Sequence, residues 1–329
     1  MTMPTEMRLA AISAMVVVLA ACEPSQDVPS TRNVPGAVIE TRDGPTRAEL
    51  QRKTQVVVLG TGTPLPDAHR AGPSIAVIHK GEAYLFDVGA GAIHNAIIAR
   101  YKYDIPSLYP NQICCVFFTH MHSDHTMDYA ELAFTLWWRR TRKLSAFGPI
   151  GLESMNEGMV AMMATDIAIR TSGTQPVPSP DGYKVDVTEI SEGVVFRKGD
   201  LTIEAFEVSH GNTKPAYGYR ITTEDKTLVI SGDTAHSEKL LEMSRGVDLL
   251  FHEVISDSGL AKTPDFWQAY HKRSHTLASE LGKLATEARP KMLVLYHGLY
   301  YGVPETVVVD EVRANYEGDV VLANDLDSF

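Results

Sequence analysis

The sequence predicts an α/β fold in which two β-sheets pack together and helices cover their outer faces. Short, β-prone apolar runs alternate with longer segments whose apolar residues recur at helical spacing. This order of strands and then helices occurs twice, and residues 171–182, which contain three prolines, form a loop between the two halves. Apolar residues make up 44% of the 329-residue chain, enough to form a large buried core. Packing two such layers together buries the apolar faces of both.

The predicted strands are short apolar or alternating runs bounded by turn residues. In the first half they cover Gln55–Leu59, Ser74–His79, Ala83–Asp87 and Ile113–Phe118. Helical spacing covers Ala90–Tyr103, Thr126–Arg140 and Leu152–Arg170. In the second half the strands are Lys184–Ile190, Gly193–Arg197, Leu201–Val208, Ala216–Thr222, Thr227–Ser231, Asp248–His252 and Lys291–Tyr296, and the helices are Ser237–Ser244, Thr276–Ala288 and Pro304–Asn315. Because residues 123–236 contain no second core, we predict one domain, residues 54–329.

Residues before this domain carry the pattern of an export signal. Arg8 precedes an apolar run, Leu9–Ala20, that is too short to span a bilayer as a mature helix. Small residues end the run before Cys22, which is typical of a signal peptide and resembles a bacterial lipoprotein box. The resemblance implies a lipoprotein signal over residues 1–21 and lipid attachment at Cys22, with Glu23 favouring an outer-membrane anchor facing the periplasm. The alternative is an ordinary signal peptide with a spare cysteine. Residues 22–53 hold four prolines and predict a flexible tether.

Charge and cysteine content restrict the expected partners. A formal net charge of −11 argues against an exposed nucleic-acid-binding surface, which should be basic, so we expect no nucleic-acid partner. The charge does permit a locally positive metal pocket, because bound ions bring charge that the composition omits. The remaining cysteines are the neighbours Cys114 and Cys115, which we expect to stay unbonded in a fold that does not depend on disulfides.

The residues most informative about chemistry follow the predicted strand Ile113–Phe118. The segment 119–125 reads Thr-His-Met-His-Ser-Asp-His and places four metal-capable side chains within six residues. His120 and His122 can point the same way from extended backbone. Asp124 and His125 lie where the chain should turn into a helix, so they can face a second point nearby. Imidazole and carboxylate groups together suit zinc and its first-row neighbours, and this pattern is typical of a two-metal hydrolase.

The segment His120-x-His122-x-Asp124-His125 resembles the signature of the metallo-β-lactamase superfamily. The surrounding chain is similar to the branch that holds ribonuclease Z and the zinc-dependent arylsulfatases. Further motifs of that branch follow in order at 59–64, 70–74, 85–89, 209–211, 217–221, 231–234, 252–253, 274–276 and 296–298. The resemblance covers roughly residues 54–329. It implies an αββα sandwich with a dinuclear metal site at the edge between the two sheets.

The resemblance also implies a ligand set. His120, His122 and His210 match the ligands of one ion, and Asp124, His125 and His297 match those of the other. Asp233 matches the bridging ligand. His210, Asp233 and His297 each follow a predicted strand, so the loops that carry them can converge at one sheet edge. Two Zn²⁺ ions are expected, although other first-row metals such as Mn²⁺ suit the same ligands.

Hydrolysis at such a site would use a metal-bridging hydroxide, because two close divalent ions lower the pKa of a shared water. Asp124 could also orient this water. His275 precedes a predicted helix at a family-matching position and is our candidate general acid for the leaving oxygen, with a helix-capping role as the alternative. His252 and Glu253 also match the family, and we interpret them as supports that orient ligand histidines.

The substrate is predicted less directly than the metal site. Only eleven residues separate Ile221 from Asp233, where ribonuclease Z carries a long tRNA-binding arm, so this interval has room for a hairpin alone. For this reason, and because the chain is acidic and carries an export signal, we expect an arylsulfatase-like enzyme acting on small sulfate esters, with phosphodiesters as side or true substrates. Trp137, Trp138, Arg139 and Arg140 suggest either an aromatic wall with an anion clamp or packing plus a solvated face. Alternative functions are an acyl hydrolase, opening a lactone or β-lactam, and a non-catalytic metal-binding lipoprotein.

Overall fold

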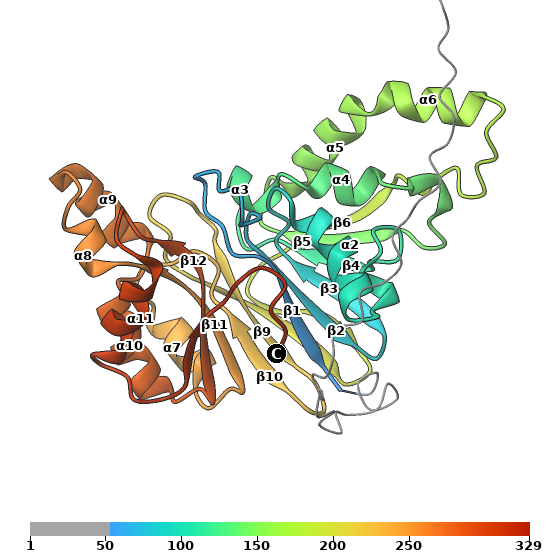
Figure 1. Cartoon of the computed structure of the whole chain (residues 1–329). Helices are drawn as coiled ribbons and strands as arrows, with labels where there is room; N and C mark the ends of the chain where they lie inside the picture. Colours follow the sequence, from blue (N-terminus) through green and yellow to red (C-terminus); the bar gives the residue numbers. More distant parts are fainter. Residues whose placement is uncertain (1–52) are drawn as a thin grey trace, which may run out of the picture. The chain divides into compact units, whose positions relative to one another are not determined.

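The computed structural model describes residues 53–329, which form two β-sheets packed face to face with helices on the outside (Figure 1). The first sheet has the order β1-β2-β3-β4-β5-β6 and the second the order β13-β12-β11-β10-β9-β8-β7. This arrangement confirms the αββα prediction. The signal-peptide, tether and Cys22 predictions concern residues outside the described range. Within that range, no helix is both long and apolar enough to cross a membrane.

The strands lie close to the predicted runs. The first sheet contains β1 Gln55–Gly60, β2 Ser74–His79, β3 Glu82–Phe86, β4 Cys115–Phe117, β5 Leu144–Gly148 and β6 Val185–Glu189. The second contains β7 Gly193–Lys198, β8 Leu201–Glu207, β9 Tyr217–Thr222, β10 Thr227–Ile230, β11 Leu249–Ile255, β12 Met292–Leu299 and β13 Val320–Leu322. The sequence reasoning did not predict β5 and β13.

The helices are α2 Ala92–Lys102, α3 Ser123–Thr126, α4 Tyr129–Phe134, α5 Leu152–Met162, α6 Ala164–Ser172, α7 Glu238–Ser244, α8 Asp257–Leu260, α9 Asp265–Ser274, α10 Ala278–Ala288 and α11 Glu305–Arg313, with 3₁₀ turns η1 Pro106–Leu108 and η2 Trp137–Arg139. The predicted helix over 126–140 is wrong beyond Phe134, because Leu136 has a left-handed backbone (φ 54°) that starts η2. The predicted helix over 152–170 breaks at Met163. Helices α8 and α9 were not predicted.

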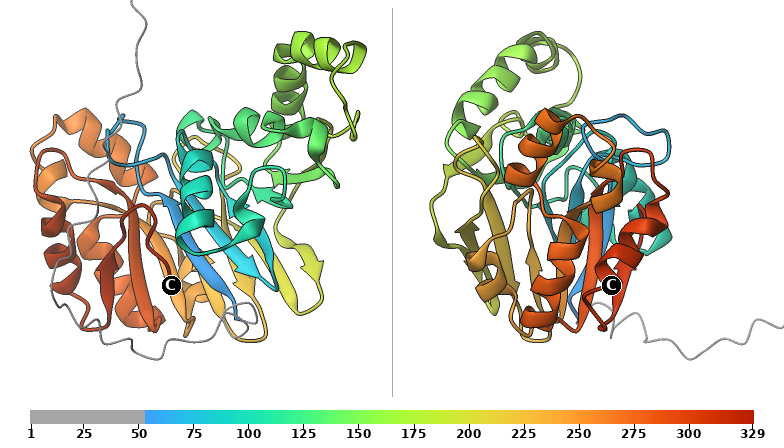
Figure 2. Two further views of the ribbon diagram at one scale, coloured as in Figure 1. Left: turned by 45° about the vertical axis from the view of Figure 1, so that its right-hand side comes forward. Right: turned by 90° about the vertical axis from the view of Figure 1, so that its left-hand side faces the viewer.

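The core forms three apolar layers. Alternate residues of β1 face opposite sides, so that Val56 and Val58 join the layer between the sheets while Val57 and Leu59 pack outward under α2. In the central layer, Phe117 lies 4.8 Å from Phe147, ring centroid to ring centroid, in a stacked arrangement. Helices α7, α10 and α11 cover the outer face of the second sheet (Figure 2). Both faces of the central strands are therefore buried, which explains their nearly continuous apolar sequences.

Two sets of parallel strands determine where the loops converge. Strand β3 is parallel to β4, and β10, β11 and β12 are parallel to one another. Parallel strands end on the same edge of a sheet, so the loops after β3 and β4 share one edge of the first sheet, and the loops after β10 and β12 share one edge of the second. Both edges lie at the top of Figure 1, where α3 and α9 stand over the two sheets.

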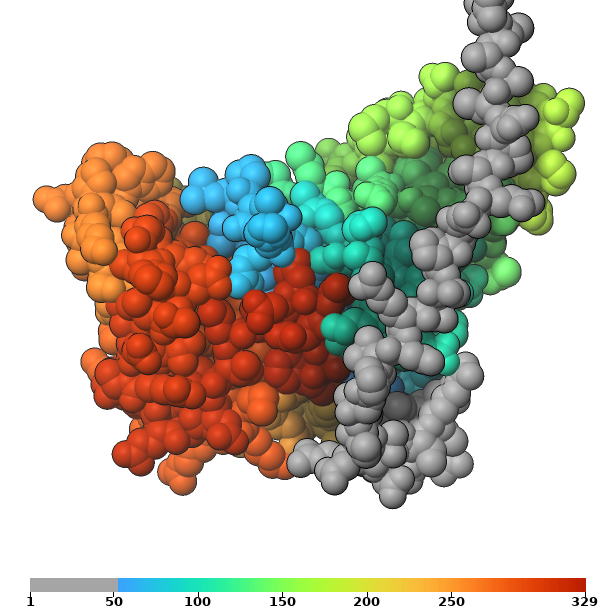
Figure 3. Space-filling model, viewed as in Figure 1, coloured from blue at the N-terminus to red at the C-terminus, as the bar shows by residue number. Residues whose placement is uncertain are grey.

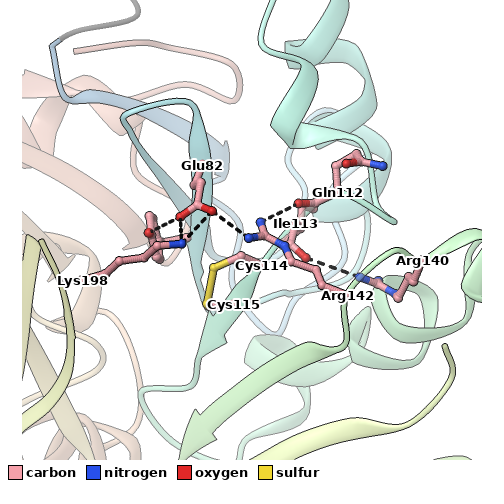
Figure 4. The surroundings of a disulfide bond; sticks show 9 residues. Glu82, Gln112, Ile113, Cys114, Cys115, Arg140, Arg142 and Lys198 are labelled. Atoms are coloured by element: carbon pink, nitrogen blue, oxygen red, sulfur yellow. Dashed lines mark hydrogen bonds and ion pairs between the residues drawn. A yellow bond between two sulfur atoms is a disulfide. The ribbon is translucent and has the colours of Figure 1, made fainter. Parts of the chain in front are cut away.

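Cys114 and Cys115 form a disulfide, so the expectation that they stay unbonded is wrong (Figure 4). Both side chains lie in the layer between the sheets, on the same side despite their adjacency. Nearby, the Glu82 carboxylate of β3 accepts hydrogen bonds from Lys198 of β7 (2.7 Å) and from Arg142 (2.7 Å). Partial burial would raise the pKa of Glu82, but these two cations and Tyr84 lower it to about 2. The ionised carboxylate thus links the two sheets.

The aromatic and basic segment 137–140 packs into the structure and forms no clamp. Trp137 is buried and donates its indole N–H to Asp166 Oδ2 (3.0 Å). Arg140 is also buried and donates to the carbonyl oxygens of Pro110 (2.9 Å) and Leu132 (2.5 Å). Burial lowers the pKa of Arg140 to about 10. Trp138 lies against the Arg170 guanidinium at 3.7 Å. The packing alternative therefore describes these residues.

Candidate metal centre

The loop after β4 brings the predicted ligands of the first motif together. Thr119 and His120 follow β4 and are buried, and α3 begins directly after His122. The loops after β8 and β10 and strand β12 add His210, Asp233 and His297. Ligand atoms lie within 4.8 Å of one another in each of four groups: His120–His122–His210, His120–His125–Asp233, Asp124–His125–His297 and His210–Asp233–His275. All predicted ligands and the predicted acid therefore lie in one cluster.

Hydrogen bonds outside the cluster assign the protonated nitrogen of the histidines. Thr119 Oγ1 donates to Asp87 Oδ2 (2.8 Å), so it accepts from His120 Nδ1 (3.0 Å). His125 Nδ1 donates to Asp87 Oδ2 (2.8 Å), and His210 Nδ1 donates to the Ser274 carbonyl oxygen (2.7 Å). Each Nε2 atom then faces the interior of the cluster, where it can offer its lone pair to a metal ion.

His122 uses the opposite nitrogen. Its Nε2 lies 3.1 Å from Thr213 Oγ1, and we assign the proton to that nitrogen. Its Nδ1 then faces His120 Nε2 (2.9 Å) and His210 Nε2 (3.2 Å). Three imidazole lone pairs that point at one another repel unless a cation lies among them. This geometry suits a divalent metal ion.

Asp233 lies between the two halves of the cluster. One oxygen, Oδ1, lies 3.3 Å from His125 Nε2 and 3.6 Å from His297 Nε2. The other, Oδ2, lies 3.8 Å from His210 Nε2. Asp124 Oδ2 completes the second half, 3.3 Å from His297 Nε2. Each Asp233 oxygen thus faces a different group of histidines, as a bridging ligand requires.

A bulge in β12 directs His297 into the cluster. The strand was expected to end before His297, but it continues to Leu299. His297 has a left-handed backbone (φ 48°), and the pairing of β11 with β12 changes register at this point. A bulge bends the strand and redirects one side chain, which places the imidazole at the sheet edge without ending the strand.

The electrostatics of the buried cluster also suit cations. Complete burial and the neighbouring imidazoles lower the pKa of His120 well below its usual value. Burial alone would raise the pKa of Asp233, but His297 and His125 hold it well below the usual range. His125 Nε2 and Asp233 Oδ1 are buried and have no hydrogen-bond partner among the described residues. Nitrogen and carboxylate donors of this kind, left without partners, fit zinc or a similar first-row metal.

His275 lies at the C-terminal end of α9, next to the cluster. Its ring centroid is 5.2 Å from that of His210, and its Nδ1 lies 3.4 Å from Glu253 Oε2. Burial would lower the pKa of His275, but the Glu253 carboxylate raises it above the usual value. Glu253 thus supports the candidate acid, whereas it was predicted to orient a ligand histidine. His252 donates to the Glu253 carbonyl oxygen, and within residues 53–329 it forms no hydrogen bond to a predicted ligand. Asp87, Thr119, Thr213 and Ser274 orient the ligands instead.

A cavity of about 600 Å³ opens onto the cluster. His122, Asp124, His210, Asp233 and His275 form its polar side. Leu65, Trp267, Tyr270, Leu299 and Tyr301 form its apolar and aromatic side. The sequence reasoning missed the aromatic residues of α9. The sequence pattern that could have indicated this aromatic helix face is the spacing of Trp267, Tyr270 and His271, which are three and four residues apart.

Comparisons with known proteins agree with this geometry. A family model described as a beta-lactamase superfamily domain matches residues 84–298. The ribonuclease Z of Mycolicibacterium gilvum is 30% identical over 247 residues, which cover 74% of this chain and 83% of the relative.

Two solved structures share the fold. One is the metallo-β-lactamase fold protein YhfI from Bacillus subtilis, with a TM-score of 0.64 and 19% identity over 84% of this chain and 98% of that one. The other is the short form of human tRNase Z, with a TM-score of 0.58 and 20% identity over 84% of this chain and 98% of that one. With the family model and the ribonuclease Z relative, they lead to one conclusion: the chain belongs to the metallo-β-lactamase superfamily of hydrolases, in the branch that includes ribonuclease Z.

Proposed function

We propose that this protein is a metal-dependent phosphodiesterase that hydrolyses RNA-type phosphodiester bonds at the cluster around Asp233. The metallo-β-lactamase fold implies a divalent metal, usually zinc, and we propose two such ions, held as predicted from the sequence. The observation that carries the proposal is the cluster of histidine nitrogens around Asp233, whose Oδ1 has no hydrogen-bond partner among the described residues, at the end of a cavity.

The expectation of a small sulfate or phosphate ester, without any nucleic-acid partner, is wrong, because the matched relatives are named ribonucleases. The expectation rested on the missing arm, on the export signal and on the net charge of the whole chain, and this net charge does not describe the surface beside the cavity. Lys262 and Lys272 directly adjoin the cavity residues Thr263 and His271 in the sequence, and Arg273 lines the neighbouring cavity; all three cations are exposed. The missing arm was predicted correctly, since only a tight turn, with the Thr223 N–H donating to the Lys226 carbonyl oxygen, joins β9 to β10.

The residues of the chain can carry out the remaining chemistry. Bound divalent ions would lower the pKa of water and stabilise negative charge on the phosphate oxygens. Asp87, Thr119 and Thr213 hold the imidazoles in the tautomers that binding requires. Asp124 remains ionised, because His297 and His125 outweigh the effect of burial on its pKa, and it can accept a hydrogen bond from the attacking water. His275 faces the same cavity and can give a proton to the leaving oxygen.

The test compares substrates on the full chain loaded with zinc. A short single-stranded RNA and bis-p-nitrophenyl phosphate are compared with p-nitrophenyl sulfate, an acyl-homoserine lactone and a β-lactam. The proposal expects both phosphodiesters to be hydrolysed faster than the other three, with the rate lost on adding a chelator and on His122→Ala. Dominant turnover of the sulfate, the lactone or the β-lactam would contradict it.

A further inference from the structure

We propose that Trp267 and Tyr270 of α9 form a stacking platform for the nucleobase next to the scissile phosphodiester. The inference rests on the proposed function and names the part of the substrate that this side of the cavity recognises. It makes these two residues determinants of specificity, with no part in bond cleavage.

The first argument is position. Trp267 and Tyr270 are three residues apart on α9, so their side chains project from one face of the helix. Both line the same cavity as His122, Asp124 and His275. A ring lying on them would therefore be within one nucleotide of the cluster. In the space-filling view, the orange segment that contains α9 rises at the upper left, beside the blue loop that follows β1 (Figure 3).

The second argument is exposure. The side chains of Trp267 and Tyr270 are 46% and 42% exposed, although both are large and apolar. Phe266 beside them is 67% exposed. A cluster of exposed aromatic rings on a soluble domain costs hydrophobic free energy, so it marks a surface that a ligand covers.

The third argument is rigidity. The Trp267 ring stacks on the ring of His271, with centroids 5.6 Å apart and planes 24° apart. His271 is buried, and the Tyr301 hydroxyl lies 2.5 Å from its Nε2. Burial and the nearby His275 lower the pKa of His271 to about 4, so this imidazole is neutral and can accept the Tyr301 hydrogen bond. Trp267 is thus supported on one face by a fixed ring, which reduces the entropy lost when a base stacks on it.

Charge distinguishes a nucleotide from other flat ligands. Lys272 and Arg273 follow the aromatic residues on α9 and are exposed. Arg273 also lines a neighbouring cavity of about 370 Å³, which shares Tyr270 with the cavity over the cluster. Aromatic rings beside exposed cations are typical of proteins that bind single-stranded nucleic acid, and base stacking of this kind tolerates any sequence.

The test measures binding of two probes to the zinc-loaded full chain by calorimetry. Uridine 5′-monophosphate and ribose 5-phosphate share a sugar and a phosphate and differ in the base. The proposal expects the nucleotide to bind about 10-fold more tightly to the unchanged protein, since stacking a base on an aromatic side chain strengthens binding about 5- to 150-fold. The affinity ratio should fall towards unity in Trp267→Ala. It should be retained in Trp267→Phe and in the matched control Phe266→Ala, because Phe266 does not line the cavity.

Each outcome decides the inference. Equal binding of the two probes to the unchanged protein overturns it, and so does a ratio that survives in both Trp267→Ala and Tyr270→Ala. A variant that fails to fold is replaced by the other of these two. Hydrolysis of bis-p-nitrophenyl phosphate is measured on the same samples. If the protein hydrolyses the diester but binds the two probes equally, the platform is rejected and the phosphodiesterase proposal stands. If it prefers the nucleotide but hydrolyses no diester, base stacking stands and the phosphodiesterase proposal is rejected.

Discussion

Replacing Asp87 by asparagine tests how the histidines are held. Asp87 is buried and accepts three hydrogen bonds of 2.8 Å, from the Thr119 N–H, from Thr119 Oγ1 and from His125 Nδ1. Asparagine keeps the shape but offers one oxygen and one NH₂ group. If the NH₂ group faces His125, the imidazole must move its proton to Nε2 and lose the lone pair that faces the cluster. If it faces the Thr119 N–H, two buried donors oppose each other.

The expected loss follows from this geometry. Removing a group that orients a ligand histidine lowers metal affinity about 10- to 100-fold, or about 1.4 to 2.8 kcal/mol. Zinc affinity is measured by competition with a chromogenic chelator. Asp128→Asn is the matched control, because Asp128 is also buried and its carboxylate accepts from the Ile93 N–H (3.0 Å), with no side-chain hydrogen bond to a predicted ligand among the described residues. If Asp87→Asn binds zinc as tightly as Asp128→Asn does, Asp87 supports the fold alone and the reasoning is refuted.

Three further predictions follow from the same contacts. Glu253→Gln should move the alkaline limb of the rate profile to lower pH, because Glu253 raises the pKa of His275 and the protonated acid is then lost earlier; an unchanged limb in a pH–rate profile would contradict this. Arg140→Ala should lower the free energy of unfolding by about 3 kcal/mol, measured in urea, because buried carbonyl oxygens lose their donor, while kcat/KM per folded molecule stays unchanged. The rise in Tm on adding zinc should shrink as the pH falls, first because His125, whose pKa lies well above its usual value, holds a proton that zinc must displace, and again well below about pH 6.5, where His120 gains its proton; a constant rise would show that histidines are not the ligands.

The strands and the first metal motif were predictable because their signals are local. Strand β2 covers the predicted residues, Ser74–His79, since its apolar run is bounded on both sides by polar or turn residues. His120, His122, Asp124 and His125 lie within six residues, so the strand and the turn after it bring them together in any fold that forms both. For His210, Asp233 and His297, the family resemblance supplied the assignment.

The features that were missed depend on tertiary structure. Helix α9 has low apolar content, and its aromatic face becomes meaningful only where the chain between β11 and α10 passes the cavity. The bulge at His297 arises from a change of register between two strands, which neither strand encodes alone. The sequence left two roles open for Trp137 and Arg140, a wall with an anion clamp or packing, and the interior position became clear only because backbone carbonyl oxygens and Asp166 accept their hydrogen bonds. Burial of such groups cannot be deduced without knowing these partners.

The most direct test of the account is to measure phosphodiester hydrolysis as a function of metal content. Metal-free full-length protein is titrated with zinc, and the rate on single-stranded RNA and the metal bound per chain are recorded on the same samples. The account predicts a rate that is absent without metal, rises with occupancy and is abolished in Asp233→Asn. RNA hydrolysis by metal-free protein, or fully loaded protein that hydrolyses no phosphodiester, would contradict it.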